Sequence, residues 1–284
     1  MLEGEVFKNN GAEEVHMTKN YDISELTRFA EDVVSLAGKE ALSFYGKGRK
    51  GKRFDENLVT EAELHLNGFF ESQLNAQYPE HQLFFNNDEN REYTHDEKRY
   101  LWVFDALDGV ANFQAGIPLW GVSLALLENF WPVLGVFYIP VTEDLFQARA
   151  GEKAFWGGRE MSPRKADDIN DESVLFTYSR FHQHYGSNFP GKIRDLGCTG
   201  AHMCYVAAGL AEGAVISKES YQGLAATRVI TEAAGLRIYK MDGSRITLNT
   251  YLDGDVIDGN MVVCSPDFYK QIRKSLSETR VRAA

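Results

Sequence analysis

The sequence predicts a layered α/β protein, and three observations lead to this expectation. Two stretches near the start carry apolar residues at helical spacing, the middle carries short apolar runs typical of strands, and the last part mixes both patterns. The chain has 284 residues, of which 44% are hydrophobic, so it can bury a large core. Charged residues make up 25%, the usual share for a globular protein, which excludes a fibrous or disordered chain.

The first elements are expected to be two helices. Apolar residues recur at helical spacing over 22–42 and again over 60–78, and the basic segment 47–53 is expected to connect the two helices. Thr60 followed by Glu63 has the form of a capping box, in which a glutamate three residues after the N-cap reaches back to a free backbone amide. The second helix is therefore expected to begin at Thr60.

Short apolar runs after residue 80 predict the strands of a sheet. The pair Gly157-Gly158 lies between Phe155-Trp156 and a polar pair, which is typical of a tight hairpin. The segment 86–99 is too polar for a core and is expected to form a mobile flap. The predicted strands cover 82–85, 100–104, 122–127, 133–139 and 144–149.

The last part of the chain is expected to form a second α/β layer system. We divide the chain into an N-terminal lobe over 1–160 and a C-terminal lobe over 161–284, joined in one compact unit. In the second lobe, strands are expected near 173–177, 214–217, 236–240 and 261–264, and helices near 201–211, near 224–234 and after Pro266.

The charge and the apolar runs restrict the partners and the location. Thirty Lys and Arg against 41 Asp and Glu give a net charge of −11, which argues against a basic nucleic-acid surface. The N-terminus lacks the pattern of a signal peptide, and the longest stretch free of charged residues, 196–211, is too short for a membrane helix. The three cysteines, Cys198, Cys204 and Cys264, cannot build a disulfide framework. We expect a cytoplasmic protein with no membrane or nucleic-acid partner.

The strongest chemical signal is a strand that runs into two aspartates. Asp105 and Asp108 end the apolar run, and Gly109 follows directly. Two carboxylates at a strand end can share Mg²⁺, a hard cation that prefers oxygen ligands, and the carbonyl of Leu107 could add a third oxygen. The amides of Gly109 and Val110 would open a helix, where a phosphate binds well. The alternative is a helix cap with a turn aspartate, which needs no metal.

Several motifs in order resemble the inositol monophosphatase family of Mg²⁺-dependent, lithium-sensitive phosphatases. The segment 105–113 resembles the family signature D-P-I-D-G-T-x-N-F, with departures at positions 106 and 110. The resemblance covers roughly residues 22–265. Further stretches resemble other family motifs in the same order: Asn57–Thr60, Tyr78–His81, Gly151–Gly158, Ala201–Cys204 and Thr231–Gly235.

The resemblance implies a five-layer α-β-α-β-α fold with an active site between two lobes, in a homodimer that acts on a small phosphorylated molecule. It implies two or three Mg²⁺ ions that activate a water and polarise the phosphate. Asp105, Asp108 and the Leu107 carbonyl correspond to metal ligands. The amides of Gly109 and Val110 correspond to phosphate donors.

Glu63 falls where the family has an aspartate that serves a further metal. We expect it to act together with Asp105 in catalysis. The capping box with Thr60 is the alternative explanation for its position.

Three positions that serve metal and water chemistry in the family differ here. Counted without a gap, Asn86 stands where the family has a metal-bridging glutamate, although a two-residue shift would bring Asp88 or Glu89 there. Val110 replaces a threonine whose hydroxyl helps to orient and deprotonate the attacking water, and Gln222 replaces an aspartate ligand. Valine cannot accept a proton, and each lost carboxylate weakens cation binding.

Two further positions are expected to face the substrate. Val215 falls where the family has a glutamate that hydrogen-bonds substrate hydroxyls, and Thr199 is expected on the same side. Because these positions read the ring hydroxyls in the family and differ here, the substrate is expected to be a small phosphomonoester whose identity the sequence does not define.

Two functions follow from these matches and departures. We favour a degraded metal site, with Mg²⁺ binding weakened or absent, that binds a small phosphomonoester with weak or no hydrolysis. This hypothesis is favoured because Asn86, Val110 and Gln222, from separate segments, all affect the same metal and water chemistry. The alternative is an active Mg²⁺-dependent phosphomonoesterase that acts on an inositol, sugar or nucleotide phosphate. A purely structural role is the third option, and the presence of the 105–113 motif argues against it.

Overall fold

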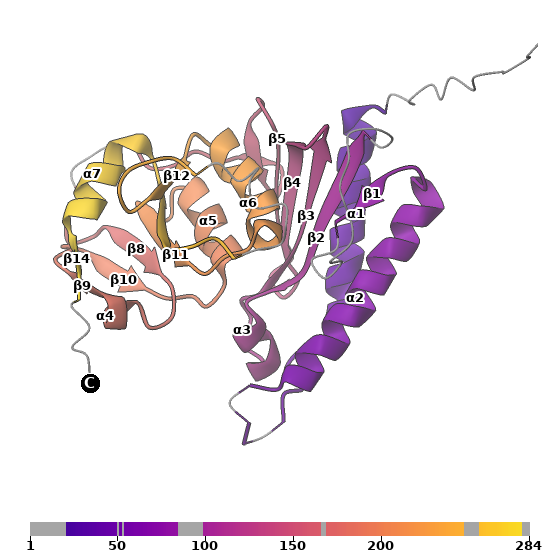
Figure 1. Ribbon diagram of the computed structural model, residues 1–284, viewed down its shortest axis with the longest axis horizontal. Coiled ribbons are helices and arrows are strands. Elements are labelled where there is room, and N and C mark those ends of the chain that lie inside the picture. The colour runs from indigo at the N-terminus through magenta and orange to yellow at the C-terminus, as the bar shows by residue number, and fades with distance from the viewer. Residues whose placement is uncertain are drawn as a thin grey trace, which may run out of the picture.

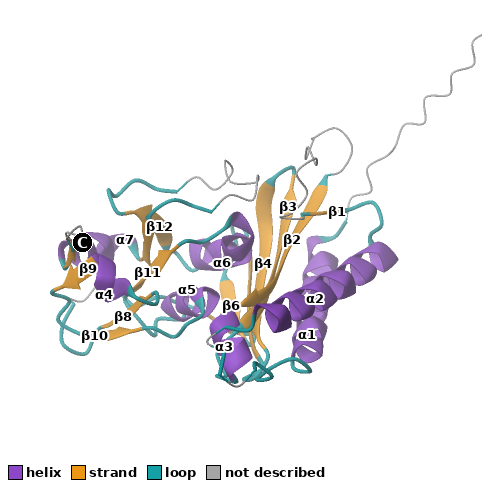
Figure 2. Ribbon diagram, turned by 60° about the horizontal axis from the view of Figure 1, so that its bottom comes forward, coloured by secondary structure: helices purple, strands orange, loops and turns teal. Residues whose placement is uncertain are grey.

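The computed structural model describes residues 21–49, 51–52, 54–84, 99–165, 169–246 and 256–279, and these form five alternating layers (Figure 1). The helices α1 (Ile23–Ala41) and α2 (Glu56–Gln77) cover one face of a seven-stranded sheet. On its other face lie α5 (Thr199–Ala207) and α6 (Tyr221–Ala233), between this sheet and a five-stranded sheet (Figure 2). The last layer is α7 (Pro266–Lys274). The predicted fold class is confirmed.

The seven-stranded sheet follows the order of the chain. Adjacent strands of this sheet are antiparallel, except that β1 runs parallel to β2. Glycines at 157 and 158 form the turn of the predicted hairpin between its last two strands. The strands are β1 (Gln82–Leu83), β2 (Tyr100–Asp108), β3 (Gly121–Glu128), β4 (Trp131–Ile139), β5 (Asp144–Arg149), β6 (Ala154–Trp156) and β7 (Arg159–Glu160).

The five-stranded sheet has a mixed topology, in the order β10-β8-β11-β13-β12. β8 lies parallel to both of its neighbours, whereas β13 is antiparallel to both of its own. The strands are β8 (Val174–Thr177), β10 (Lys192–Arg194), β11 (Gly213–Ser217), β12 (Arg237–Lys240) and β13 (Asn260–Cys264). A small sheet pairs β9 (Tyr185–Ser187) with β14 (Leu276–Glu278), and two short helices complete the fold, α3 (Val110–Ala115) and α4 (Phe181–His184).

Three apolar clusters fill the spaces between the layers. One lies between the helices α1 and α2 and the seven-stranded sheet, and another between the five-stranded sheet and α7. The largest cluster surrounds α5 and α6 and includes residues of both sheets, such as Phe137 and Val263. Because burial of apolar surface is the main stabilising term in folding, the shared cluster ties the two halves of the chain together.

The helix α6 packs very closely against the seven-stranded sheet. A Cβ atom placed on Gly135 of β4 would lie only 2.2 Å from the carbonyl oxygen of Ala226. Only a glycine allows this approach of helix and strand backbones. The approach matters for function because α6 begins at the candidate site described below.

The second helix begins earlier than the sequence predicts. α2 starts at Glu56 with Asp55 as its N-cap, so Thr60 and Glu63 lie inside the helix and form no capping box. The prediction of a helix start at Thr60 is wrong, because the helix continues through a segment that also has a cap-like pattern.

The flap predicted over 86–99 lies outside the described residues except for Arg99.

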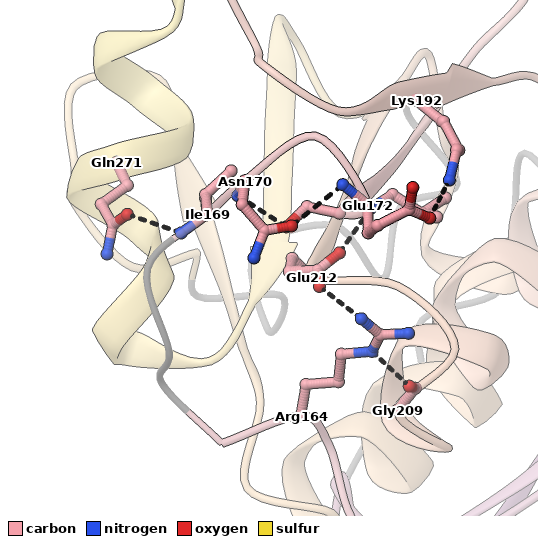
Figure 3. Close-up of polar contacts among 10 residues, drawn as sticks. Arg164, Ile169, Asn170, Glu172, Lys192, Gly209, Glu212 and Gln271 are labelled. Atoms are coloured by element: carbon pink, nitrogen blue, oxygen red, sulfur yellow. Dashed lines mark hydrogen bonds and ion pairs between the residues drawn. The ribbon is translucent and has the colours of Figure 1, made fainter.

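The segment that follows β7 is fixed to the second half of the chain by a polar network (Figure 3). Arg164 donates to the carboxylate of Glu212 at 2.9 Å and to the carbonyl of Gly209 at 3.0 Å. Glu212 is buried, and its other oxygen accepts from the amide of Val174 in β8 at 2.6 Å. We propose the junction after residue 160 as the boundary of the two lobes, with Arg164 as the first anchor of the second lobe.

The cysteines and the helices bear on the expectations about disulfides and membrane spans. Cys198, Cys204 and Cys264 are all buried and unbonded to one another. In the described ranges, no helix is long and apolar enough to cross a membrane.

Candidate functional site

The end of β2 brings two carboxylates close to the start of α5. Along a regular strand, Asp105 and Asp108 would point to opposite faces, because side chains alternate. The pairing with β3 is irregular between these two residues, since Asp105 lies opposite Ser123 and Asp108 lies opposite Gly121. Both aspartates are half-buried, and the charge of Asp108 adds to burial in raising the pKa of Asp105. The irregular strand end therefore places the predicted pair together.

Asp108 is held by the start of α5. Its carboxylate accepts the backbone amide of Thr199 at 3.1 Å and that of Gly200 in a short hydrogen bond. Burial raises the pKa of Asp108, and these amide hydrogen bonds oppose the rise because they favour the charged form. The first free amides of a helix thus orient this side chain and lower the cost of its charge.

Glu63 reaches the same site from α2. Its pKa is raised by burial, and its charge contributes to raising the pKa of Asp105 to about 7, after burial and the charge of Asp108. The structure therefore brings together Glu63, Asp105 and Asp108, which the sequence placed in one site. With the capping box removed, a helix cap no longer explains the position of Glu63.

Glu219 is the acidic residue that the sequence reasoning missed. It precedes α6, is half-buried, and accepts a hydrogen bond from the hydroxyl of Thr199 at 2.7 Å. Burial and the charges of Asp108 and Asp105 raise the pKa of Glu219 to about 8. A Cβ atom on Gly223 would lie 3.4 Å from one Glu219 oxygen and 3.7 Å from an Asp105 oxygen, so both carboxylates flank the space that this glycine leaves. Glu219 stands three residues before Gln222, and a search for acidic neighbours of that position would have found it.

Gln222 lies beside the site, and its side chain binds the backbone of β2. Its amide nitrogen donates to the backbone carbonyl of Phe104, the residue before Asp105. A carboxylate could not make this hydrogen bond because it has no donor. The amide therefore links the first turn of α6 to the end of β2. Asn86, Asp88 and Glu89 lie outside the described residues.

The turn after Asp108 requires its glycine. Gly109 has a φ of +83°, and a Cβ there would lie 3.1 Å from the Cβ of Cys198. Its amide also favours the charged form of Asp108, and the amide of Val110 begins the six-residue helix α3. Asn112 of the same motif donates to the carbonyls of Leu119 and Leu196, each at 2.7 Å. The motif asparagine therefore joins α3 to the segment that leads into α5.

Comparison with known proteins assigns the chain to a family. The model of the inositol monophosphatase family matches residues 22–280, most of the chain. The chain belongs to the inositol monophosphatase family. The resemblance that the motifs indicated is thereby confirmed.

Relatives of this family member carry several phosphatase names. The chain is 33% identical over 156 residues to a fructose-1,6-bisphosphatase of Pyrococcus furiosus, covering 54% of this chain and 61% of the relative. It is 30% identical over 218 residues to a histidinol-phosphatase of Chlorobaculum parvum, covering 73% and 83%. It is 28% identical over 255 residues to an inositol-1-monophosphatase of Caulobacter vibrioides, covering 81% and 96%.

Solved structures of family members share the fold. An extragenic suppressor protein of Pyrococcus furiosus matches with a TM-score of 0.71 and 25% identity, covering 88% of this chain and 100% of that one. An inositol monophosphatase of Thermotoga maritima matches with a TM-score of 0.70 and 21% identity, covering 88% and 96%. These similarities support the five-layer fold described above.

A cavity of about 530 Å³ adjoins Asp108 and Glu219 of this family member, at the start of α5 and the end of β11. Thr199, whose amide binds Asp108, and Glu219 line it together with Arg180 and Lys218. Neither cation forms an ion pair with another described residue, and both have positive φ, a conformation that long side chains rarely adopt. The cavity thus carries two cations without a described ion-pair partner, together with the acidic residues Asp195 and Glu219.

The two residues expected on the substrate side are placed differently. Thr199 lines the cavity. Val215 lies in β11, is fully buried, and packs in the apolar cluster between the five-stranded sheet and α7. It is not among the described residues that line the cavity. Side chains alternate along a strand, and the position of Val215 in β11 places it on the face toward α7. A motif comparison does not reveal this face.

The charge of the site fits a hard cation. No lysine or arginine among the described residues forms an ion pair with Glu63, Asp105, Asp108 or Glu219. Buried carboxylates without a positive partner are costly unless they bind a proton or a metal. In the described part of the chain, no three acidic, histidine or cysteine side chains converge closely enough to hold an ion by themselves. Water or backbone oxygens, such as that of Leu107, would have to complete the ligand set.

Proposed function

We propose that this chain is a metal-dependent phosphomonoester hydrolase that acts on a small phosphorylated molecule. The observation that carries the proposal is the gathering of Glu63, Asp105, Asp108 and Glu219 without a neutralising cation, beside the Gly109 turn. The sequence alone favoured a degraded site because Asn86, Val110 and Gln222 all depart from residues that serve metal and water in the family. Glu219 supports the active alternative, because it supplies a carboxylate three residues earlier, close to Asp105.

Each residue would have a defined task. Asp105, Asp108 and Glu219 would hold divalent metal, which when bound polarises the phosphate and lowers the pKa of a water. The amides of Thr199 and Gly200 keep Asp108 in place.

Two further groups would act on the substrate and its water. Glu63, whose pKa is raised by burial, would accept a proton from water at its carboxylate. The amide of Val110, at the start of α3, would bind a phosphate oxygen.

The test is phosphate release from a panel of phosphomonoesters that includes inositol 1-phosphate, fructose 1,6-bisphosphate and histidinol phosphate. We expect release that depends on Mg²⁺ or Mn²⁺, stops in EDTA, and falls about 10²-fold or more in Asp105→Asn, because that carboxylate is central to the cluster. Glu71→Gln, a substitution at an exposed position of α2, is the control and should match the wild type. Absence of release from every substrate would overturn the proposal.

A second candidate function is binding of a phosphomonoester without hydrolysis. Val110 favours it because valine cannot orient or deprotonate water, and Gln222 favours it because its amide is committed to β2. Under this candidate, inositol 1-phosphate would raise the melting temperature without being hydrolysed. The double variant Val110→Thr, Gln222→Asp would then be expected to gain release.

The assembly and location are also proposals. We propose a cytoplasmic homodimer, on the resemblance to the family. Light scattering coupled to size-exclusion chromatography would contradict the dimer if it gave the mass of a single chain, 32.0 kDa.

A further inference from the structure

A second cavity, of about 690 Å³, lies at the other end of α6. It is bounded by the start of β4, the turn after β5, the last two turns of α6, and β12 with the segment that follows it. Gln222 opens α6 at the candidate active site, whereas Glu232 near its end lines this cavity. Ten helical residues separate the two, about 15 Å along the axis. The two sites are therefore distinct but share one helix.

Three arginines from different elements line this cavity. Arg228 comes from α6, Arg237 from β12, and Arg245 from the segment after β12. Arg237 and Arg245 form no ion pair with any carboxylate in the described part of the chain, and both lower the pKa of the neighbouring Tyr239 against the effect of its burial. Their charges therefore act on the same small region.

The carboxylates of the cavity are already paired. Glu232 accepts from Nε of Arg228 at 3.0 Å, and Glu152 lies 3.8 Å from a guanidinium nitrogen of Arg149. The remaining positive charge of the cavity is consequently not neutralised from within the described chain. An anion entering it would meet the guanidinium groups of Arg237 and Arg245, which no described carboxylate neutralises.

Arg228 supplies the observation that points to a ligand. Its side chain is 15% exposed, and its Nη1 atom is buried without any hydrogen-bond partner among the described residues. A buried charged donor without an acceptor is costly, because water can no longer satisfy it. An oxyanion in the cavity would complete this hydrogen bond, and guanidinium groups are well suited to phosphate oxygens.

We propose that this cavity, lined by Arg228, Arg237 and Arg245, is a binding site for a polyphosphate anion, either inorganic or the polyphosphate part of a nucleotide. The proposal does not depend on the proposed phosphatase activity. Its site is separate from the four carboxylates, which repel a free polyphosphate when no metal is present. Trp131 at the rim is 64% exposed and lines the same cavity, so it reports on occupancy.

The experiment uses the full chain in EDTA with inorganic tripolyphosphate as the probe. Binding is measured by calorimetry and by protection of Trp131 from acrylamide quenching, with Trp131→Phe to identify its signal. We expect the double variant Arg237→Gln, Arg245→Gln to weaken binding at least tenfold. Arg228→Lys, which keeps the charge and removes the orphaned nitrogen, should weaken it severalfold.

The control is Arg194→Gln combined with Arg159→Gln, both outside the cavity. Arg194 is a close match to Arg237, because each donates from Nη1 to the carbonyl of its preceding residue. The control should bind within twofold of the wild type. Failure of the wild type to bind, equal binding by the Arg237/Arg245 variant, or binding that leaves Trp131 quenching unchanged would each overturn the proposal. ATP in the same assay shows whether a nucleotide can supply the anion, and its binding must show the same dependence on Arg237 and Arg245.

Discussion

Glu219 shows how a single side chain can change the interpretation of an active site. Motif comparison directs attention to Gln222, where a carboxylate is missing, and away from Glu219, which approaches the same aspartates from the preceding loop. Charge within a cluster depends on where carboxylates lie in space and not on which motif position holds them. A metal site can therefore keep its charge after one of its usual positions changes.

The first prediction concerns the cost of the Glu219 charge. Its folded pKa of about 8 lies above the unfolded value of 4.5, so the folded state binds more protons, and stability from this group is lost as pH rises from about 4.5 past 8. In EDTA at pH 8.5, Glu219→Gln should therefore be more stable than the wild type, by roughly 2 kcal/mol or about 5 °C in melting temperature. At pH 6 the difference in stability between Glu219→Gln and the wild type should be smaller, because Glu219 is then mostly protonated in the folded state.

Metal provides the control for this prediction. Mg²⁺ should raise the melting temperature of the wild type more than that of Glu219→Gln, because the variant lacks a charged ligand. Glu71→Gln should follow the wild type throughout. An equal Mg²⁺ effect in both proteins would show that Glu219 takes no part in metal binding.

The second prediction concerns His202, which stacks on Phe176 and accepts the amide of Leu196 at Nε2. Burial lowers the pKa of His202 to about 4, below the unfolded value of 6.5, so the unfolded state binds more protons between these values. Its contribution to stability is therefore lost as pH falls through this window, by about 2 kcal/mol between pH 7.5 and 5. Urea unfolding of wild type and His202→Gln at both pH values measures the difference, and His182→Gln is the exposed control. If the unfolding free energies of wild type and His202→Gln changed equally with pH, this prediction would be wrong.

At the scale of elements, the position of α6 decides both sites. Its first turn carries Gln222 and follows Glu219, its end lines the arginine cavity, and its middle rests against Gly135 of β4. Gly135→Ala should force helix and strand apart, because a Cβ there would lie 2.2 Å from a backbone oxygen. We expect a loss of roughly 3 kcal/mol in unfolding free energy, measured in urea.

Gly68 provides a matched glycine for this third prediction. It lies within α2, and a Cβ there would meet no atom within 4 Å. Gly68→Ala should therefore stabilise the protein by about 0.5–1 kcal/mol through helix propensity. If both substitutions had the same effect, the close packing of α6 on β4 would not be the cause.

At the scale of the whole molecule, the layer of α5 and α6 serves both sheets. The largest apolar cluster includes Val103 and Phe146 of one sheet and Ile216 and Val263 of the other. We expect the full chain to unfold in one cooperative transition, and the fragment 1–160 to remain unfolded, because it would expose a complete apolar sheet face. Circular dichroism in urea measures this, and two separate transitions would contradict it.

Much of the fold followed from local patterns. Helical spacing located α1 and α6, and apolar runs located β3, β4 and β5 to within a few residues, because these patterns are local consequences of side-chain periodicity. The short elements α4, β9, β10 and β14 were not anticipated. Each of them has only three or four residues, too few to show a periodic pattern, and only their tertiary neighbours stabilise them.

The sequence by itself determined the family, the layered fold and the aspartate pair, since the 105–113 motif encodes a strand end, a left-handed glycine and a helix start in consecutive residues. Only the tertiary structure decided that Glu63 and Glu219 join this pair, that Val215 faces the opposite side of its sheet, and that three arginines meet at the far end of α6. The physical reason is that charges interact through space over a few ångströms. Residues more than 100 positions apart become neighbours only when the layers pack.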